Sequence, residues 1–150
     1  MIDTNVLTLL TAMLGVLLVI LLVYYIIMVI AQWRIFAKAG QPGWKSIIPF
    51  YNSYILYKIV WQVKWFWIVF GLGILSSVVS WLNMSGGNGF LLAVSRIIVV
   101  VAFILSVFLC SKTAKAYGKG IGFTVGLVLL HPIFMLILAF GSAEYVGAQE

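Results

Sequence analysis

The sequence has very few charged residues. Asp and Glu together number 3, and charged residues of both signs make up only 8% of the 150 residues. A soluble domain needs roughly a quarter of its residues charged to cover its surface, so this composition excludes one. The chain is also 65% hydrophobic, with a mean hydropathy of +1.21. These values predict a polytopic membrane protein that forms a single integral membrane domain over residues 1–150, with no separate soluble domain.

Residues that bind metals or carry out catalysis are equally scarce. Cys110 is the single cysteine, which excludes an internal disulfide and any site built from several thiolates. His131 is the single histidine, and no carboxylate lies within the apolar runs, so a metal centre is not expected. The glycine-rich loop at 86–89 lacks the Lys-Ser/Thr pair of a phosphate-binding loop. We therefore predict no cofactor, no metal and no catalytic residue, and expect a protein that is not an enzyme.

The hydrophobic residues gather in four runs, at about 6–31, 65–82, 90–110 and 121–140. Each is near the roughly 20 residues that a spanning helix needs. The first run is too long for a signal-peptide core and follows no basic residue, so it is expected to remain as a transmembrane helix. The predicted fold is an all-α membrane protein. It has four transmembrane helices plus a short interfacial or re-entrant segment on the cytoplasmic side.

That segment, at about 44–61, lies within the polar stretch from Arg34 to Lys64. Gly40 and the Pro42-Gly43 pair are turn signals that end the first helix. Pro49 then interrupts an apolar part that is too short to cross a bilayer and is rich in aromatic residues. These features favour a segment at headgroup level or a shallow re-entrant one, with a spanning helix as the alternative.

The distribution of charge decides between these alternatives. If the segment does not cross, one side of the membrane holds eight of the basic residues, and the only charged residues in the loops on the other side are acidic. The basic residues are Arg34, Lys38, Lys45, Lys58, Lys64, Lys112, Lys115 and Lys119, and the acidic ones are Asp3, Glu144 and Glu150. This is a positive-inside pattern, which predicts a bacterial cytoplasmic (inner) membrane protein with both termini outside the cytoplasm. The net charge of +6 is then read as orientation and contact with anionic headgroups, and not as nucleic-acid binding.

Small residues mark surfaces on which helices can approach closely. Thr8, Thr11, Ala12 and Gly15 form a narrow stripe on the first run. The predicted helix-packing glycines are Gly15, Gly73, Gly118, Gly122 and Gly126, of which the last three have GxxxG spacing. The contact can lie within the chain or between copies.

Two ionisable residues fall inside predicted spans, where charge is costly and therefore a functional hypothesis. Arg96 and His131 are expected at similar depth, together with Ser76, Ser77 and Ser80, as a candidate polar cluster in the outer half of the bundle. Such a cluster could form a proton or anion pathway, or a pocket for a lipid headgroup. The alternative is that Arg96 extends outward to Glu144 or Asp3, while His131 bonds a carbonyl freed by Pro132. A serine hydrolase pair of His131 with Ser76 or Ser77 lacks the usual glycine context of the nucleophile.

Two stretches resemble a known family. Lys38-Ala39-Gly40, Pro42-Gly43-Trp44 and Ile48-Pro49-Phe50-Tyr51-Asn52 form the first, and Ala114 to Lys119 with Phe140 to Tyr145 the second. They resemble an uncharacterised family, a domain of unknown function, of small bacterial multi-pass membrane proteins that is sometimes found fused to or associated with signal peptidase I. The resemblance implies residence in a bacterial membrane and supplies no mechanism. No Ser–Lys pair of a signal peptidase is recognisable here.

The function we favour from the sequence is a non-enzymatic scaffold or accessory subunit that packs against a membrane-protein partner or forms a homo-oligomer. Its predicted cytoplasmic interface is aromatic and basic. This interface comprises Arg34, Lys38, Pro42, Gly43, Trp44, Pro49, Phe50, Tyr51, Asn52, Lys112, Lys115 and Lys119. The second interpretation is a small transporter or channel lined by the polar cluster, and the third a membrane-embedded enzyme acting on lipid or peptide.

Overall fold

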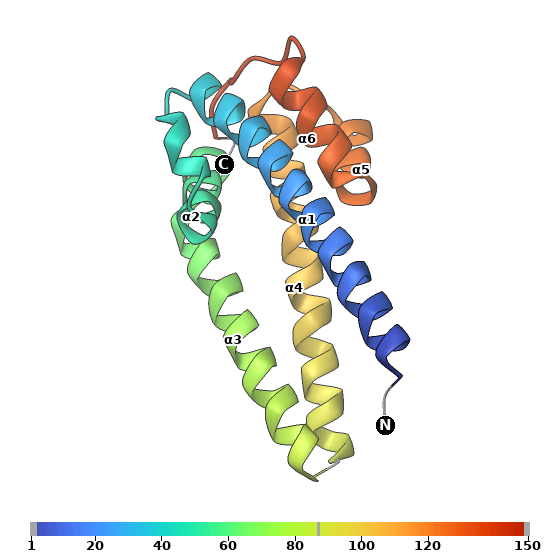
Figure 1. Ribbon diagram of the computed structural model, residues 1–150. Coiled ribbons are helices and arrows are strands. Elements are labelled where there is room, and N and C mark those ends of the chain that lie inside the picture. The colour runs from blue at the N-terminus through green and yellow to red at the C-terminus, as the bar shows by residue number, and fades with distance from the viewer. Residues whose placement is uncertain (1–2, 87, 149–150) are drawn as a thin grey trace.

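The computed structural model describes residues 3–86 and 88–148, and the part of the chain that it describes is helical, without a strand (Figure 1). The elements are α1 (Thr4–Lys38), the short 3-10 helix η1 (Gly43–Ser46), α2 (Pro49–Val60), α3 (Val63–Gly86), α4 (Gly89–Ala116), α5 (Ile121–Leu129) and α6 (His131–Phe140). Among these, α1, α3 and α4 are long and apolar enough to cross a membrane. The all-α class and the membrane character are therefore confirmed. Glu150, one of the predicted outer acids, lies outside the described residues.

The long helices meet at one end of the molecule. The Tyr117 hydroxyl, just after α4, donates to the Ile35 carbonyl near the end of α1 at 2.7 Å, so both helices finish together. Helix α3 is antiparallel to α4, and α2, α5, α6 and residues 141–148 gather at this same end (Figure 1). We call this end the head.

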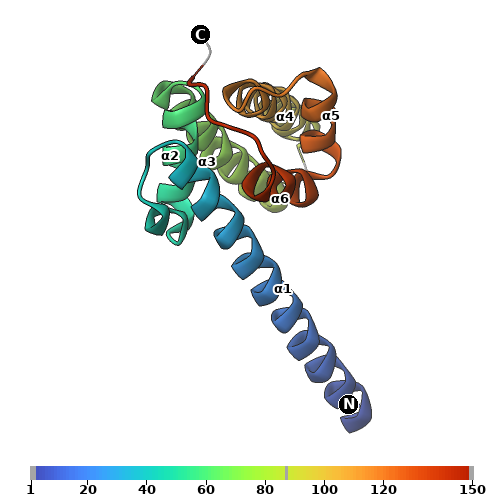
Figure 2. The same cartoon turned by 90° about the horizontal axis from the view of Figure 1, so that it is seen from above.

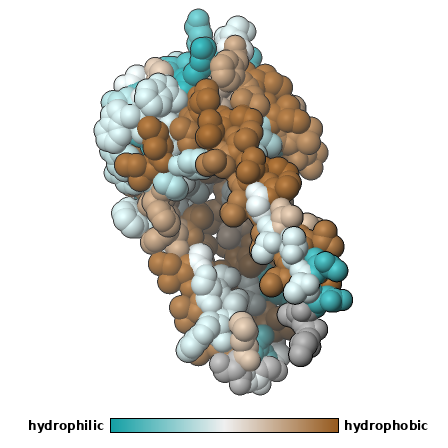
Figure 3. All heavy atoms as spheres, viewed as in Figure 1, coloured by the Kyte–Doolittle hydropathy of each residue, from teal (hydrophilic) through white to brown (hydrophobic). Residues whose placement is uncertain are grey.

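The hydrophobic core lies in the head. Its fully buried members come from α1, α2, α4, α5 and α6, and include Phe36, Ile55, Tyr117, Leu127 and Leu138. Away from the head α1 leads away from the other helices, whereas α3 and α4 approach each other (Figure 1). Apolar residues cover much of the visible face of the molecule (Figure 3). Each residue from Asp3 to Ile27 is exposed. The fold is thus a packed head with long, exposed apolar helices extending from it.

The predicted fourth span at 121–140 is not one helix. It is divided at Leu130, whose φ of −129° and ψ of 50° break the helix between α5 and α6. Pro132 explains the break, since its ring would clash with the carbonyl four residues earlier and it has no N–H to donate. At 1.5 Å per residue each helix is only about 14–15 Å long, against roughly 30 Å of bilayer core.

Both ends of this helical pair lie in the head. Helix α5 begins shortly after α4 ends, and the Lys38 Nζ at the end of α1 donates to the carbonyls of Leu138 and Gly141 at the end of α6, each at 2.8 Å. In between, the Phe123 and Phe134 rings pack edge to face, with centroids 5.0 Å apart. The segment therefore turns back on itself.

This reversal determines where the chain ends. The Val146 amide donates to the Ala116 carbonyl at 2.8 Å, and the Tyr145 hydroxyl donates to the Ile59 carbonyl at 2.6 Å, so the C-terminal residues 141–148 lie on the head. The N-terminal end of α1 lies at the opposite end of the molecule (Figure 1). The side of a membrane on which each terminus lies, predicted to be the same for both, stays a prediction.

The segment predicted at 44–61 consists of η1 and α2, and it lies alongside the long helices. The Tyr25 hydroxyl donates to the Ile47 carbonyl at 2.6 Å, and Tyr25 lies about 20 Å before the end of α1 at 1.5 Å per residue. Helix α2 then returns antiparallel to α3: its Phe50 contacts Phe70, and Trp61 stacks on Trp65. After the turn at Gly40 the chain therefore runs along α1 away from the head, and α2 brings it back toward the head.

Candidate functional site

The predicted polar cluster is not held together by hydrogen bonds between its members within the described residues. Among the described residues, no hydrogen bond or ion pair links Arg96, His131 and the three serines to one another. Arg96 is exposed on α4, about 30 Å along the helix from Ala116 at 1.5 Å per residue, so Glu144 in the head is out of its reach. These positions give no geometric support to a continuous polar path.

His131 and Ser77 instead bond backbone carbonyls close to them in the sequence. His131 Nδ1 lies 3.3 Å from the Leu127 carbonyl, one turn earlier, at the turn between α5 and α6. The Ser77 hydroxyl donates to the Gly73 carbonyl of its own helix at 2.9 Å, while Ser76 is partly buried and Ser80 is exposed. A bond from His131 to a nearby carbonyl is what the alternative interpretation expected, although the carbonyl belongs to Leu127.

The predicted packing glycines have different surroundings. Gly126 is buried, and a Cβ there would overlap the Phe134 ring of α6. A Cβ would meet nothing within 4 Å at Gly15, Gly73, Gly118 or Gly122. Gly118 has a φ of 66°, so its place in the sequence serves the turn after α4. The GxxxG spacing is therefore used inside the chain at one of its three positions.

Two residues of the predicted cytoplasmic interface, Arg34 and Lys38, contact α6. Besides the bonds of Lys38 to α6 carbonyls, the Arg34 guanidinium lies over the Phe140 ring, 4.7 Å from its centroid. A charged donor at a helix C-terminus satisfies carbonyls that have no intrahelical partner and suits the helix dipole. Sequence spacing gave no signal for this role, because it depends on the return of α6 to the head.

Most of the residues in the 42–52 region that resemble the known family fix the path of the chain beside α1. Gly43 lies under the Trp33 indole so closely that a Cβ would overlap it. The Asn52 amide donates to the Gln32 side-chain oxygen and to the Ser46 carbonyl. Pro49 occupies the first position of α2, where its missing N–H costs no helical bond. The predicted interface residues Gly43, Pro49 and Asn52 are thus structural in this fold.

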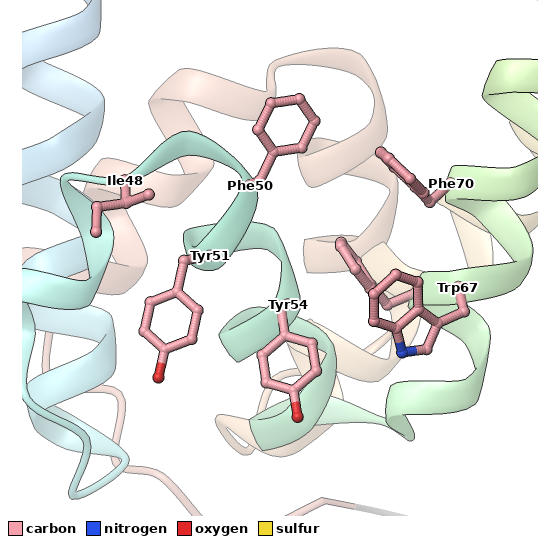
Figure 4. Close-up of a pocket in the computed structure, with 7 residues that line it drawn as sticks. Ile48, Phe50, Tyr51, Tyr54, Trp67 and Phe70 are labelled. Atoms are coloured by element: carbon pink, nitrogen blue, oxygen red, sulfur yellow. The ribbon is translucent and has the colours of Figure 1, made fainter.

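A hollow of about 530 Å³ lies between α2 and α3, and we call it the aromatic groove (Figure 4). Its lining residues are Ile48, Phe50, Tyr51, Tyr54, Phe66, Trp67 and Phe70. The Trp44, Tyr51 and Tyr54 rings are stacked in sequence with centroids 6.2 and 6.0 Å apart, and Tyr54 meets Phe66 edge to face at 5.7 Å. Sequence reasoning named Phe50 and Tyr51 but missed the α3 residues, although Phe66 and Phe70 are one turn apart and so share a face.

Lysines lie on the head side of this groove. Lys58 follows Tyr54 by one turn on α2, and Lys64 precedes Trp67 by one turn on α3, so each continues a lining face toward the head. The Lys45 Nζ lies 5.9 Å from the centroid of the Tyr51 ring and donates to the Gln41 side-chain oxygen at 3.0 Å. The groove is therefore lined mainly by apolar and aromatic side chains, and lysines lie next to its head end.

Histidine, cysteine and carboxylate side chains do not gather in groups of three or more anywhere in residues 3–86 and 88–148.

In the head, burial raises the pKa of the Tyr117 hydroxyl well above its ordinary range, and the neighbouring Tyr145 raises it further. This hydroxyl therefore stays neutral and remains a hydrogen-bond donor. Apolar side chains line most of the aromatic groove, so a ligand bound there would be largely apolar.

A protein-family model described as a family of unknown function (DUF5684) matches residues 44–148 of the chain. The match begins within η1 and includes the groove, the α3–α4 hairpin, and the α5–α6 pair. Comparisons with curated proteins and with solved structures found no match.

Proposed function

The chain belongs to this family of unknown function (DUF5684), and we propose that it is a non-enzymatic membrane scaffold or accessory subunit that assembles through α1. The observation that carries the proposal is the exposure of each residue from Asp3 to Ile27. This part of α1 leads away from the other helices (Figure 2). At 1.5 Å per residue it is about 36 Å long, enough to cross a bilayer core without support from the rest of the chain.

The surface of α1 suits contact with another helix. Between membrane helices the driving force is close packing, which favours small residues. The Thr8 hydroxyl donates to the Thr4 carbonyl at 2.9 Å, and the Thr11 hydroxyl to the Thr8 carbonyl at 2.9 Å, so neither needs a partner's acceptor. Together with Ala12 and Gly15 they leave a shallow surface on which a second copy of α1 or a partner's helix can pack.

We further propose that the protein lies in the bacterial cytoplasmic membrane with its head on the cytoplasmic side. Helices α1, α3 and α4 would cross, whereas η1 with α2, and α5 with α6, would enter from the head side and return. Lys38, Lys58, Lys64 and Lys115 all belong to elements that end or begin in the head, which supports this orientation. The N-terminus would then lie outside and the C-terminus inside.

The proposal is tested by the native mass of the tagged protein in nanodiscs, with mass spectrometry of stoichiometric companions. Gly15→Leu, on the small-residue stripe, should reduce the assembled fraction several-fold. Leu17→Trp adds similar bulk on the opposite face of α1 and should leave assembly unchanged. A strictly monomeric particle without companions would contradict the proposal, and so would equal effects of the two substitutions.

A further inference from the structure

We propose that the aromatic groove binds one anionic phospholipid. An acyl chain would lie between α2 and α3, and the phosphate would lie at the head side near Lys45, Lys58 and Lys64. The proposal rests on the placement of the head at a membrane surface, but not on the scaffold function. It concerns surfaces other than α1, so either proposal can fail alone.

The groove has the size and lining that an acyl chain requires. Its volume of about 530 Å³ lies within the range of roughly 300–1,000 Å³ that is usual for small-ligand pockets. Ile48, Phe50 and Phe70 line it with hydrocarbon only, and the edge-to-face contact of Phe50 with Phe70, at 5.9 Å, joins its two walls. A chain there would contact side chains of α2 and α3 at once.

The polarity of the groove changes along its length. In Figure 4 the hydroxyls of Tyr51 and Tyr54 point away from Phe50 and Phe70. Helix α3 begins at the head, so Phe70 lies one turn farther from the head than Trp67. Because the hydroxyls point away from Phe70, they point toward the head. Tyrosine and tryptophan with this orientation are typical of the level of lipid headgroups. The groove therefore matches the two parts of a phospholipid in order, with hydrocarbon deep and polar groups near the head.

Charge selects an anionic headgroup over a zwitterionic one. Lys45, Lys58 and Lys64 form no ion pair with a carboxylate in the described residues, so their charge is not neutralised within the chain. Lys45 is partly buried, and its contacts with Gln41 and the Tyr51 ring hold the ammonium beside the groove. It retains donors for a phosphate after its bond to Gln41, because an ammonium has three.

The test is native mass spectrometry of the full chain, released from nanodiscs that contain equal amounts of phosphatidylglycerol and phosphatidylcholine. We expect one retained phosphatidylglycerol per chain, with a preference of about tenfold over phosphatidylcholine. The triple variant Lys45→Gln, Lys58→Gln, Lys64→Gln should lose this preference. The control, Lys115→Gln with Lys119→Gln, removes two charges from the same end of the protein away from the groove and should keep it.

A second measurement locates the chain without any substitution. Phosphatidylglycerol with a photoreactive diazirine on its acyl chain should label peptides from residues 48–70 above the level expected for lipid-exposed surface. Labelling spread evenly over α1, α3 and α4 would overturn the proposal, because it indicates ordinary surrounding lipid. Equal retention of the two lipids by the unchanged protein would overturn it as well.

Discussion

The contact between Gly126 and Phe134 holds the α5–α6 pair together, and it can be tested by adding a single methyl group. A Cβ at Gly126 would overlap the Phe134 ring, whereas at Gly122, one turn earlier on the same helix, it would meet nothing within 4 Å. Gly126→Ala and Gly122→Ala therefore make the same chemical change in two different surroundings.

The expected free energies of unfolding follow from these surroundings. Overpacking costs about 1–3 kcal/mol, and displacing Phe134 also weakens its edge-to-face contact with Phe123, which is worth about 0.5–1.5 kcal/mol. Better helix propensity of alanine offsets up to about 1 kcal/mol of this. Gly126→Ala should thus destabilise the protein by about 1–3 kcal/mol, and Gly122→Ala should be neutral or slightly stabilising.

The assay is reversible unfolding in mixed micelles titrated with sodium dodecyl sulfate and followed by far-ultraviolet circular dichroism. Phe134→Ala removes the ring that Gly126→Ala would displace, so the double variant should lose much less stability than the sum of the two single variants. Equal effects at Gly122 and Gly126, or additivity in the double variant, would refute the proposed packing. A change in oligomer mass with Gly122→Ala alone would instead place the glycine spacing between copies.

Three further substitutions test the head. Lys38→Met removes both bonds to the end of α6 and should lower the free energy of unfolding by about 1–2 kcal/mol in the same titration, a modest value because the site is partly exposed. Hydrogen exchange in the last turn of α6 should become faster, and unchanged exchange would argue against the contact. Tyr117→Phe should lower the free energy of unfolding by about 1 kcal/mol, because it removes the bond to Ile35. Burial raises the pKa of Tyr117, so the stability that the hydroxyl contributes is constant at lower pH and declines as the pH rises above about 10. A variant with the same alkaline loss of stability as the unchanged protein would contradict this. Gly43→Ala should displace the Trp33 indole and cost about 1 kcal/mol, with a shift in tryptophan emission, and an unaltered spectrum would speak against the close approach.

The sequence was sufficient for the features that depend on composition and local turns. Long apolar runs identified the three helices α1, α3 and α4, and Gly40 identified the turn after α1, where the structure has a φ of 68°. These predictions succeed because a lipid-exposed helix and a left-handed turn are each set by a few neighbouring residues.

The sequence was insufficient where the outcome depends on contacts between distant residues. Arg34 and Lys38 have the spacing of headgroup-binding residues, yet they contact α6, about 100 positions later. The aromatic groove likewise requires α2 to return beside α3, so Phe66 and Phe70 gain their role only from tertiary structure. Local patterns cannot distinguish a cation that faces lipid from one that satisfies the carbonyls of a returning helix.

The reversal at 121–140 shows why the charge argument could not detect it. The positive-inside rule counts basic residues on either side of a crossing, and the last one in this chain is Lys119. No lysine or arginine follows the segment, so the bias is the same whether it crosses or returns. The remaining sequence signal was Pro132, which a spanning helix can accommodate as a kink if neighbouring groups satisfy the freed carbonyl. Here the chain breaks at Leu130 instead, and Lys38 stabilises the returning end by bonding the last carbonyls of α6.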